Sequence, residues 1–138
     1  MIAEDTLDAV MAVMDTSFDP QWREAWTRSQ VGDSLAMPST FLLLVDGEGA
    51  PVAGGPAAGF VLSRQALDEE ELLLIAGRPE DRGRGLGGQL IASYIETARR
   101  RGVRRIFLEM RANNPAHTLY NRVGFAPIGT RPRYYLAA

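Results

Sequence analysis

Glycines gather where a strand is expected to pass into a helix. Gly83, Gly85 and Gly88 satisfy the pattern G-x-G-x-x-G, in which missing side chains let a phosphate approach successive backbone N–H groups. Glu109 follows at about the distance expected of an acid that binds a ribose hydroxyl. The pattern predicts a phosphate site, and a dinucleotide-binding domain is one class of protein that contains such a site.

Two observations weigh against a dinucleotide-binding domain. Residues 78–82 separate the expected strand end from the first glycine, whereas the dinucleotide fingerprint places its tight turn directly after the strand. Only 50 residues follow Gly88, which is too few for the remaining strands of such a domain. A purely structural role in the loop is a third interpretation, although each glycine at a helix start costs backbone entropy.

The same segment also fits Arg-x-x-Gly-x-Gly, with Arg82, Gly85 and Gly87 at the fixed positions. Three further motifs follow it: Leu-Glu-Met-Arg at 108–111, Asn-Pro-Ala at 114–116, and Leu-Tyr at 119–120 before Gly-Phe at 124–125. This combination resembles the GNAT acetyltransferases, in which such a loop wraps the pyrophosphate of coenzyme A at the positive end of a helix dipole.

Within that family, residues 71–136 are similar to the RimI-type ribosomal-protein-alanine N-acetyltransferases, and residues 17–45 follow them loosely. The chain departs from their pattern in three ways. The usual first strand is short or absent, Gly77 and Arg78 stand where Val-Asp is frequent, and the spacing from Asn114 to Tyr120 is one residue shorter. The placement of Tyr120 depends on that spacing.

The resemblance implies acetyl-CoA as co-substrate, no metal, and a role for each matching residue. Glu109 is implied as the general base that removes the amine proton, and Tyr120 as the general acid that protonates the departing thiolate. The residues implied to bind acetyl-CoA are Ile75, Ala76 and Gly77 at the acetyl and pantetheine portion, Arg82, Gly83, Arg84, Gly85, Leu86, Gly87 and Gly88 at the pyrophosphate, and Asn114 at the pantetheine arm.

Each assignment has a structural alternative. Glu109 is an exposed strand residue in the simplest interpretation, although it shares the alternating face of Phe107 in a strongly apolar strand. Tyr120 is otherwise core packing, and Asn114 a helix cap. His117 is the only histidine, and one imidazole makes neither a metal site nor a catalytic triad unaided.

The acceptor is the least constrained part of the function. The resemblance implies a primary amine, namely the N-terminal α-amine of a protein, and in RimI-type enzymes the N-terminal alanine of a ribosomal protein. The expected partners are therefore acetyl-CoA and a protein or peptide N-terminus. A small-molecule amine acceptor and a non-catalytic acyl-CoA-binding module stay open, because function is argued from the acceptor site and not from the fold.

Apolar spacing predicts the elements that position these residues. Helices are expected after a cap at Asp5, after Asp19-Pro20 with Trp22 and Trp26 one turn apart, from Leu86 to a stop at Gly102, and briefly after Asn114. Strands are expected at 40–45, 59–63, 71–76, 104–111, 125–130 and 133–136. This order predicts an α/β (α+β) domain with a mixed, mostly antiparallel sheet flanked by helices.

Composition limits the remaining classes. At 138 residues without cysteine, the chain predicts one domain, 1–138, with no disulfide and no cysteine nucleophile. An acidic N-terminus and the lack of a long apolar run predict a soluble cytoplasmic protein without a membrane partner.

Charge is distributed unevenly along the chain. Residues 1–77 hold 3 arginines against 13 acids, and residues 78–138 hold 12 arginines against 4 acids. That basic half suits either solvated surface or a phosphorylated ligand, but not nucleic acid, because no array of stacking aromatics accompanies it.

Overall fold

The computed structural model describes residues 4–17, 26–52, 56–78, 85–109, 126–128 and 133–137. The helices are α1 (Glu4–Ser17), α2 (Arg28–Leu35) and α3 (Leu86–Arg100). The strands are β1 (Thr40–Val45), β2 (Pro51–Val52), β3 (Gly59–Ala66), β4 (Glu69–Gly77), β5 (Arg105–Glu109), β6 (Ala126–Ile128) and β7 (Arg133–Ala137). The helix α1 is the first described element.

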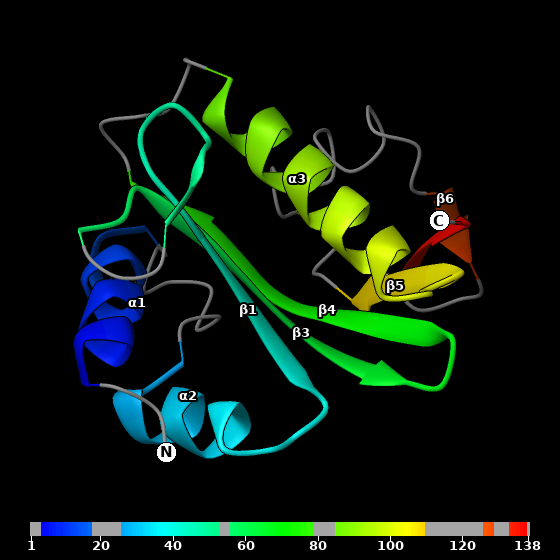
Figure 1. Ribbon diagram of the computed structural model, residues 1–138, viewed down its shortest axis with the longest axis horizontal. Coiled ribbons are helices and arrows are strands. Elements are labelled where there is room, and N and C mark those ends of the chain that lie inside the picture. The colour runs from blue at the N-terminus through cyan, green and yellow to red at the C-terminus, as the bar shows by residue number, and fades with distance from the viewer. Residues whose placement is uncertain are drawn as a thin grey trace.

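The strands form one seven-stranded sheet in the order β2-β1-β3-β4-β5-β7-β6 (Figure 1). Every pairing in it is antiparallel except that of β4 with β5. The apolar run 71–76 lies in β4, the central strand, as its lack of polar alternation predicts. The predicted mixed, mostly antiparallel sheet is therefore confirmed.

Two apolar layers cover the two faces of the sheet. Residues of β1 alternate between them: Leu43 and Val45 pack with α3, whereas Leu42 and Leu44 pack with α1 and α2. We call these layers the α3-side core and the α1/α2-side core. The buried stripe of α3, the helix predicted from Leu86 onward, consists of Leu86, Leu90, Ile91, Tyr94, Ile95 and Ala98. The residues of α1 that reach its own core include Val10 and Met14.

A β-bulge interrupts the alternation in the middle of β4. Leu74 lies opposite Leu62 of β3, but the next pair is Leu72 with Ser63, so Leu73 is the extra residue. Leu72 packs in the α3-side core, whereas Leu73 and Leu74 both pack in the α1/α2-side core. The bulge therefore changes which β4 residues face α3, and Ile75 rather than Leu74 packs on that side.

The second helix differs from its prediction. The predicted start at Asp19-Pro20 lies outside the described residues, and Trp26 precedes the helix α2 instead of lying within one. The Thr27 hydroxyl accepts from Gln30 N–H at 3.1 Å, and the Gln30 side chain accepts from Thr27 N–H at 2.8 Å. This capping box fixes the helix start, and its signature T-x-x-Q was present in the sequence. Similarly, α1 begins at Glu4, so Asp5 lies inside the helix instead of capping it.

Candidate functional site

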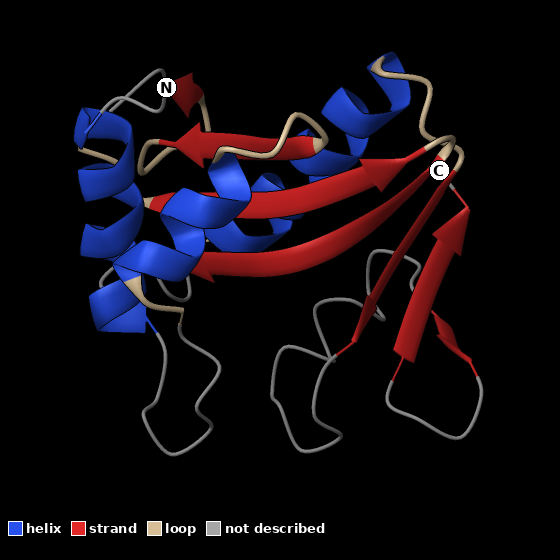
Figure 2. Cartoon of the chain, turned by 90° about the horizontal axis from the view of Figure 1, so that it is seen from below, coloured by secondary structure: helices blue, strands red, loops and turns tan. Residues whose placement is uncertain are grey.

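The sheet opens between β4 and β5. Their parallel pairing joins only Glu69–Glu71 to Arg105–Phe107, although β4 continues to Gly77 and β5 to Glu109. Figure 2 shows the strands leaving one corner of the sheet in two directions. The C-terminal part of β4, after Glu71, therefore lacks a neighbouring strand on its β5 side among the described strands. The bulge at Leu73 lies near the start of this opening.

The hydrogen-bond register shows which β4 backbone groups face the opening. Arg78 N–H donates to the Ala58 carbonyl of the β3 side at 2.7 Å. Because bonded pairs alternate along an antiparallel ladder, Ala76 and Leu74 also direct their N–H groups at β3. Ile75 therefore directs its N–H away from β3 and into the opening. The predicted segment Ile75, Ala76 and Gly77 thus provides a backbone donor where a carbonyl oxygen can bind.

The start of α3 provides further donors. Gly85 is the N-cap with φ +80°, and no side chain caps the helix there. Gln89 N–H donates to the Gly85 carbonyl at 3.1 Å, and the N–H groups of Leu86, Gly87 and Gly88 before it have no partner within the helix. A Cβ added to Gly85 or Gly88 would have no neighbour within 4 Å. Packing against the described residues therefore requires neither glycine, while the positive φ of Gly85 favours glycine at the N-cap and the helix N-terminus is open to an anion.

The structure brings the two predicted halves of the site together. A Cβ at Gly77, the last residue of β4, would lie 3.5 Å from Leu86 Cδ2 in the first turn of α3. The backbone donor at Ile75 is two residues away from this contact. The end of β4 and the first turn of α3 are therefore neighbours.

Several predicted residues are placed only in part or lie outside the described residues. Glu109 is the last residue of β5, pairs with Arg133 of β7, and lies two residues beyond the final β4 pair at Phe107. The backbone of Glu109 therefore lies beyond the point where β5 separates from β4. The other predicted residues in this group are Arg82, Gly83, Arg84, Asn114 and Tyr120, and all five lie outside the described residues.

A buried polar group that the sequence did not predict joins β4 to α3. Glu70 has no exposed surface and accepts a 2.6 Å hydrogen bond from the Tyr94 hydroxyl. The Arg101 guanidinium forms a bidentate pair with the same carboxylate. Burial raises the pKa of the Tyr94 hydroxyl, and the negative charge of Glu70 raises this pKa further. The Tyr94 hydroxyl therefore remains neutral and donates its hydrogen bond to Glu70 at neutral pH.

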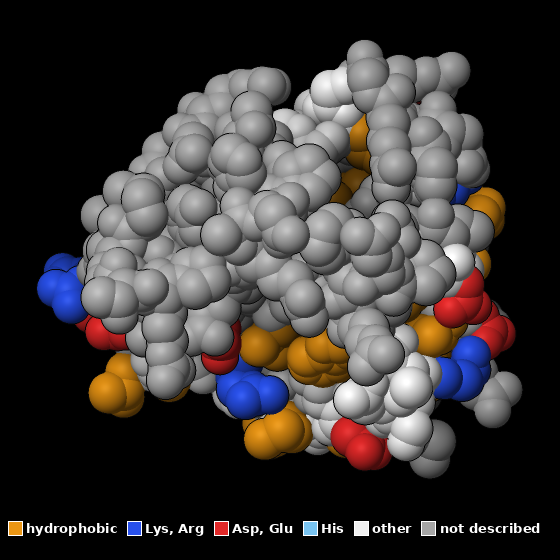
Figure 3. All heavy atoms as spheres, turned by 180° about the vertical axis from the view of Figure 1, so that it is seen from behind, with side chains coloured by type: hydrophobic (Ala, Val, Ile, Leu, Met, Phe, Trp, Pro, Cys, Tyr) orange, Lys and Arg blue, Asp and Glu red, His pale blue; other side chains and the backbone are white. Residues whose placement is uncertain are grey.

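Part of the charge asymmetry is resolved by pairs between the two halves of the sequence. Arg101 pairs with Glu70, and Arg105 lies 3.7 Å from Glu69, so two arginines of the basic half meet two acids of β4. Among the described side chains of the rear face, basic and acidic groups are interspersed (Figure 3). These contacts give some of the arginines a structural role without a phosphorylated ligand.

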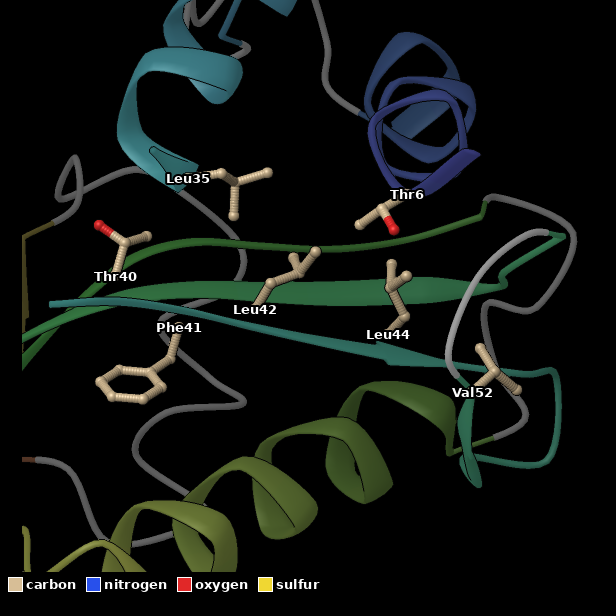
Figure 4. Close-up of a pocket in the computed structure, with 7 residues that line it drawn as sticks. All are labelled: Thr6, Leu35, Thr40, Phe41, Leu42, Leu44 and Val52. Carbon is tan, nitrogen blue, oxygen red and sulfur yellow. The ribbon is translucent and has the colours of Figure 1, made fainter. Parts of the chain in front are cut away.

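An open pocket of about 400 Å³ lies on another part of the molecule, between β1, α1 and α2. Figure 4 shows Leu42 and Leu44 pointing toward the helices and Phe41 pointing to the opposite face of β1. The lining residues are Thr6, Leu35, Thr40, Phe41, Leu42, Leu44 and Val52. Because they include none of the predicted site residues, this pocket is separate from the opening between β4 and β5.

The described residues contain no group of three or more histidine, cysteine or acidic side chains placed to hold a metal ion. In the same part of the chain, no helix has the length and apolar character needed to cross a bilayer.

Comparison with known proteins assigns the chain to a class. The sequence profile of the Acetyltransferase (GNAT) family matches residues 7–125, and the chain belongs to this family. It is therefore an acetyl-CoA-dependent N-acetyltransferase. The mostly antiparallel sheet and this membership exclude the dinucleotide-binding interpretation of the glycines.

Two of the relatives are named for an alanine acceptor. The chain is 30% identical over 132 residues to a putative [ribosomal protein bS18]-alanine N-acetyltransferase of Bacillus subtilis, a match covering 95% of this chain and 82% of the relative. It is 36% identical over 77 residues to the [ribosomal protein bS18]-alanine N-acetyltransferase of Haemophilus influenzae, which covers 56% of this chain and 53% of that protein.

Solved structures share the fold. The ribosomal-protein-S18-alanine N-acetyltransferase from Escherichia coli is similar with a TM-score of 0.75 at 23% identity, covering 99% of this chain and 90% of that one. The PaiA N-acetyltransferase from Thermoplasma acidophilum, solved in complex with coenzyme A, is similar with a TM-score of 0.72 at 13% identity, covering 96% of this chain and 95% of that one.

Proposed function

We propose that the protein transfers the acetyl group of acetyl-CoA to the N-terminal α-amine of a protein, and that the preferred acceptor is a ribosomal protein beginning with alanine. The observation that carries this proposal is the 30% identity to the Bacillus subtilis relative over 95% of the chain, since that relative is named for this acceptor. The opening beside Ile75 supports the part of the proposal that concerns acetyl-CoA, because an extended backbone edge suits the amides of the pantetheine arm.

The proposed site assigns the two ends of acetyl-CoA to two elements. The pyrophosphate binds at the first turn of α3, with Gly85, Leu86, Gly87 and Gly88 supplying backbone N–H groups, and with Arg82, Gly83 and Arg84 completing the loop. The acetyl and pantetheine portion lies along Ile75, Ala76 and Gly77, and Asn114 binds the arm. The N–H of Ile75 stabilises the oxygen that becomes negative as the amine attacks the thioester carbon.

The proposed proton path has one acid and one base. Glu109 removes a proton from the acceptor amine, directly or through water, so that the neutral nitrogen attacks. Collapse of the tetrahedral adduct breaks the carbon–sulfur bond, and Tyr120 protonates the departing thiolate. The backbone position of Glu109 at the opened end of β5 supports its part of this assignment.

A peptide panel tests the proposed acceptor. The protein is incubated with acetyl-CoA and peptides that differ only in their first residue, and release of free CoA is measured together with the mass of the peptide. We expect the alanine peptide to be acetylated fastest, and the same peptide with a blocked N-terminus and an internal lysine to be inert. Transfer to the lysine, or only to small amines offered in parallel, would contradict the proposal.

A further inference from the structure

Three glycines outside the predicted phosphate loop lie beneath the first turns of α3. They come from three places: Gly49 from the turn between β1 and β2, Gly59 from the start of β3, and Gly77 from the end of β4. We call them the glycine seat. A Cβ on Gly77 would lie 3.5 Å from Leu86 Cδ2, and one on Gly59 would lie 3.2 Å from Leu90 Cδ2. A Cβ on Gly77 would make only an ordinary van der Waals contact, so it is the lack of a side chain at Gly59 and Gly49 that lets the start of α3 lie close to the sheet.

Gly49 makes the tightest contact of the seat. It is buried, and its φ of +85° is a conformation that other residues rarely adopt. A Cβ there would lie 2.6 Å from Gln89 Oε1 and 2.9 Å from Gln89 Cβ. Both distances are shorter than a van der Waals contact allows. Rotation of the flexible side chain can relieve the contact with Oε1, but Gln89 Cβ is attached to the helix backbone, so a side chain on residue 49 would displace residue 89 itself.

Gln89 connects this contact to the phosphate end of the proposed site. Its N–H donates to the Gly85 carbonyl at 3.1 Å, which is the bond that closes the first turn of α3. A shift of Gln89 therefore moves Gly85 and the N–H groups that follow it. Those N–H groups are the donors assigned to the pyrophosphate.

The turn that carries Gly49 is held rigidly. Asp46 Oδ1 accepts from Glu48 N–H at 2.9 Å and from Ala50 N–H at 3.0 Å. Asp46 N–H donates to the Ala50 carbonyl at 2.9 Å, and Gly49 N–H donates to the Asp46 carbonyl at 3.0 Å. A turn with four internal bonds does not yield easily, so the helix start moves when the contact is overfilled.

We propose that Gly49 is a positioning residue for acetyl-CoA. Its lack of a side chain sets the distance between the β1–β2 turn and Gln89. This distance in turn sets the position of the first turn of α3 relative to the strand edge at Ile75. Binding a ligand that spans both elements requires that distance to be held. This inference rests on the proposed assignment of the phosphates to the start of α3.

Gly49→Ala tests the proposal, with Gly102→Ala as the matched control. Gly102 has a φ of +84° at the other end of α3, and a Cβ there would have no neighbour within 4 Å. The two substitutions share the same backbone strain, so both should lower the melting temperature. Only Gly49→Ala should raise the Kd for acetyl-CoA, measured by calorimetry, by about tenfold, the effect of weakening one or two hydrogen bonds to a charged group. Its KM for acetyl-CoA should rise likewise, while KM for the acceptor peptide stays constant.

Gln89→Ala provides the second arm, because it removes the 2.6 Å contact. The double variant Gly49→Ala, Gln89→Ala should recover part of the lost affinity. If Gly49→Ala alone does not fold, Gly49→Ala and Gly102→Ala are compared in the Gln89→Ala background. The variant with Gly49→Ala should still bind acetyl-CoA more weakly than the variant with Gly102→Ala, because the 2.9 Å contact with the Cβ of residue 89 remains.

Two outcomes separate this inference from the site on which it rests. Gly85→Ala is measured in the same series. Weakened binding by Gly85→Ala but wild-type affinity in Gly49→Ala would overturn the positioning role alone. Wild-type affinity in Gly85→Ala would remove the phosphates from the start of α3 and overturn the site assignment.

Discussion

The Tyr94 hydroxyl of α3 donates a 2.6 Å hydrogen bond to Glu70 of the central strand β4, and Glu70 is completely buried. Glu70 lies opposite Ile106, one residue before the last β4–β5 pair. The carboxylate therefore ties α3 to the sheet next to the point where the two strands separate. The other end of α3, with its glycine N-cap, is the end proposed to bind the phosphates of acetyl-CoA.

Removing the buried charge should destabilise the fold far more than removing an exposed one on the same helix. Glu70→Gln leaves Arg101 without its carboxylate, and we expect the free energy of unfolding to fall by about 3 kcal/mol, near the lower end for a broken buried pair because Arg101 retains some exposure. Glu96→Gln breaks an exposed pair with Arg100 at 2.6 Å and should cost about 0.5 kcal/mol or less. Urea unfolding at neutral pH checks both, and equal losses would contradict the structural role of Glu70.

The raised pKa of Tyr94 predicts a specific loss of stability in alkali. The folded-state pKa exceeds the value of about 10 in the unfolded chain, so the stabilisation is fully present below pH 10 and is lost as the pH rises above it. The slope due to this group is about 1.4 kcal/mol per pH unit. The difference in unfolding free energy between wild type and Tyr94→Phe should therefore be constant from pH 8 to about 10 and should shrink between pH 10 and 11. A constant difference over that range would show that the tyrosine titrates normally.

Ligand binding should distinguish the coenzyme A site from the dinucleotide site that the glycine spacing also resembles. Acetyl-CoA in hundredfold excess over its Kd should add about 2.7 kcal/mol to the free energy of unfolding, and NAD should add nothing. Differential scanning fluorimetry with each ligand gives the comparison as a shift in Tm. A shift produced by NAD alone is the result that would reject the proposed site.

Much of the architecture was predictable because it depends on local patterns. The strand 40–45 and the six-residue buried stripe of α3 follow from apolar spacing that any neighbouring layer would bury. The helix α2 also has a local signal, the capping box at Thr27, although Asp19-Pro20 is the more prominent helix-start pattern in the sequence.

The features that shape the site were not local. The bulge at Leu73 depends on how β3 and β4 pair, and the direction of the Ile75 N–H depends on the same register. The contact of Gly49 with Gln89 joins residues from two separate elements. The bonds of Glu70 reach 24 and 31 residues along the chain to Tyr94 and Arg101. Sequence spacing gives no indication of such contacts unless the topology is known.

The proposed acid at Tyr120 can be tested separately from the base. Tyr120→Phe keeps the ring and removes the proton donor, so kcat should fall by about 10²-fold or more, with the Kd for acetyl-CoA nearly unchanged. Higher pH should not restore the rate, because it supplies no acid for the thiolate. A fully active variant would show that the shorter spacing from Asn114 places Tyr120 away from the sulfur, as a core residue.

Glu109, at the edge of the opening between β4 and β5, is the proposed base for acetyl transfer. The pH dependence of kcat for Glu109→Gln, measured beside its Kd for acetyl-CoA, tests this role. We expect an unchanged Kd and a kcat lowered by about 10²-fold or more at neutral pH. We also expect partial recovery of kcat as the pH rises past the amine pKa of about 7.7 to 8.0, where the acceptor is neutral without help. Full activity of Glu109→Gln at neutral pH would contradict this role and leave Glu71 or an ordered water as the candidate base.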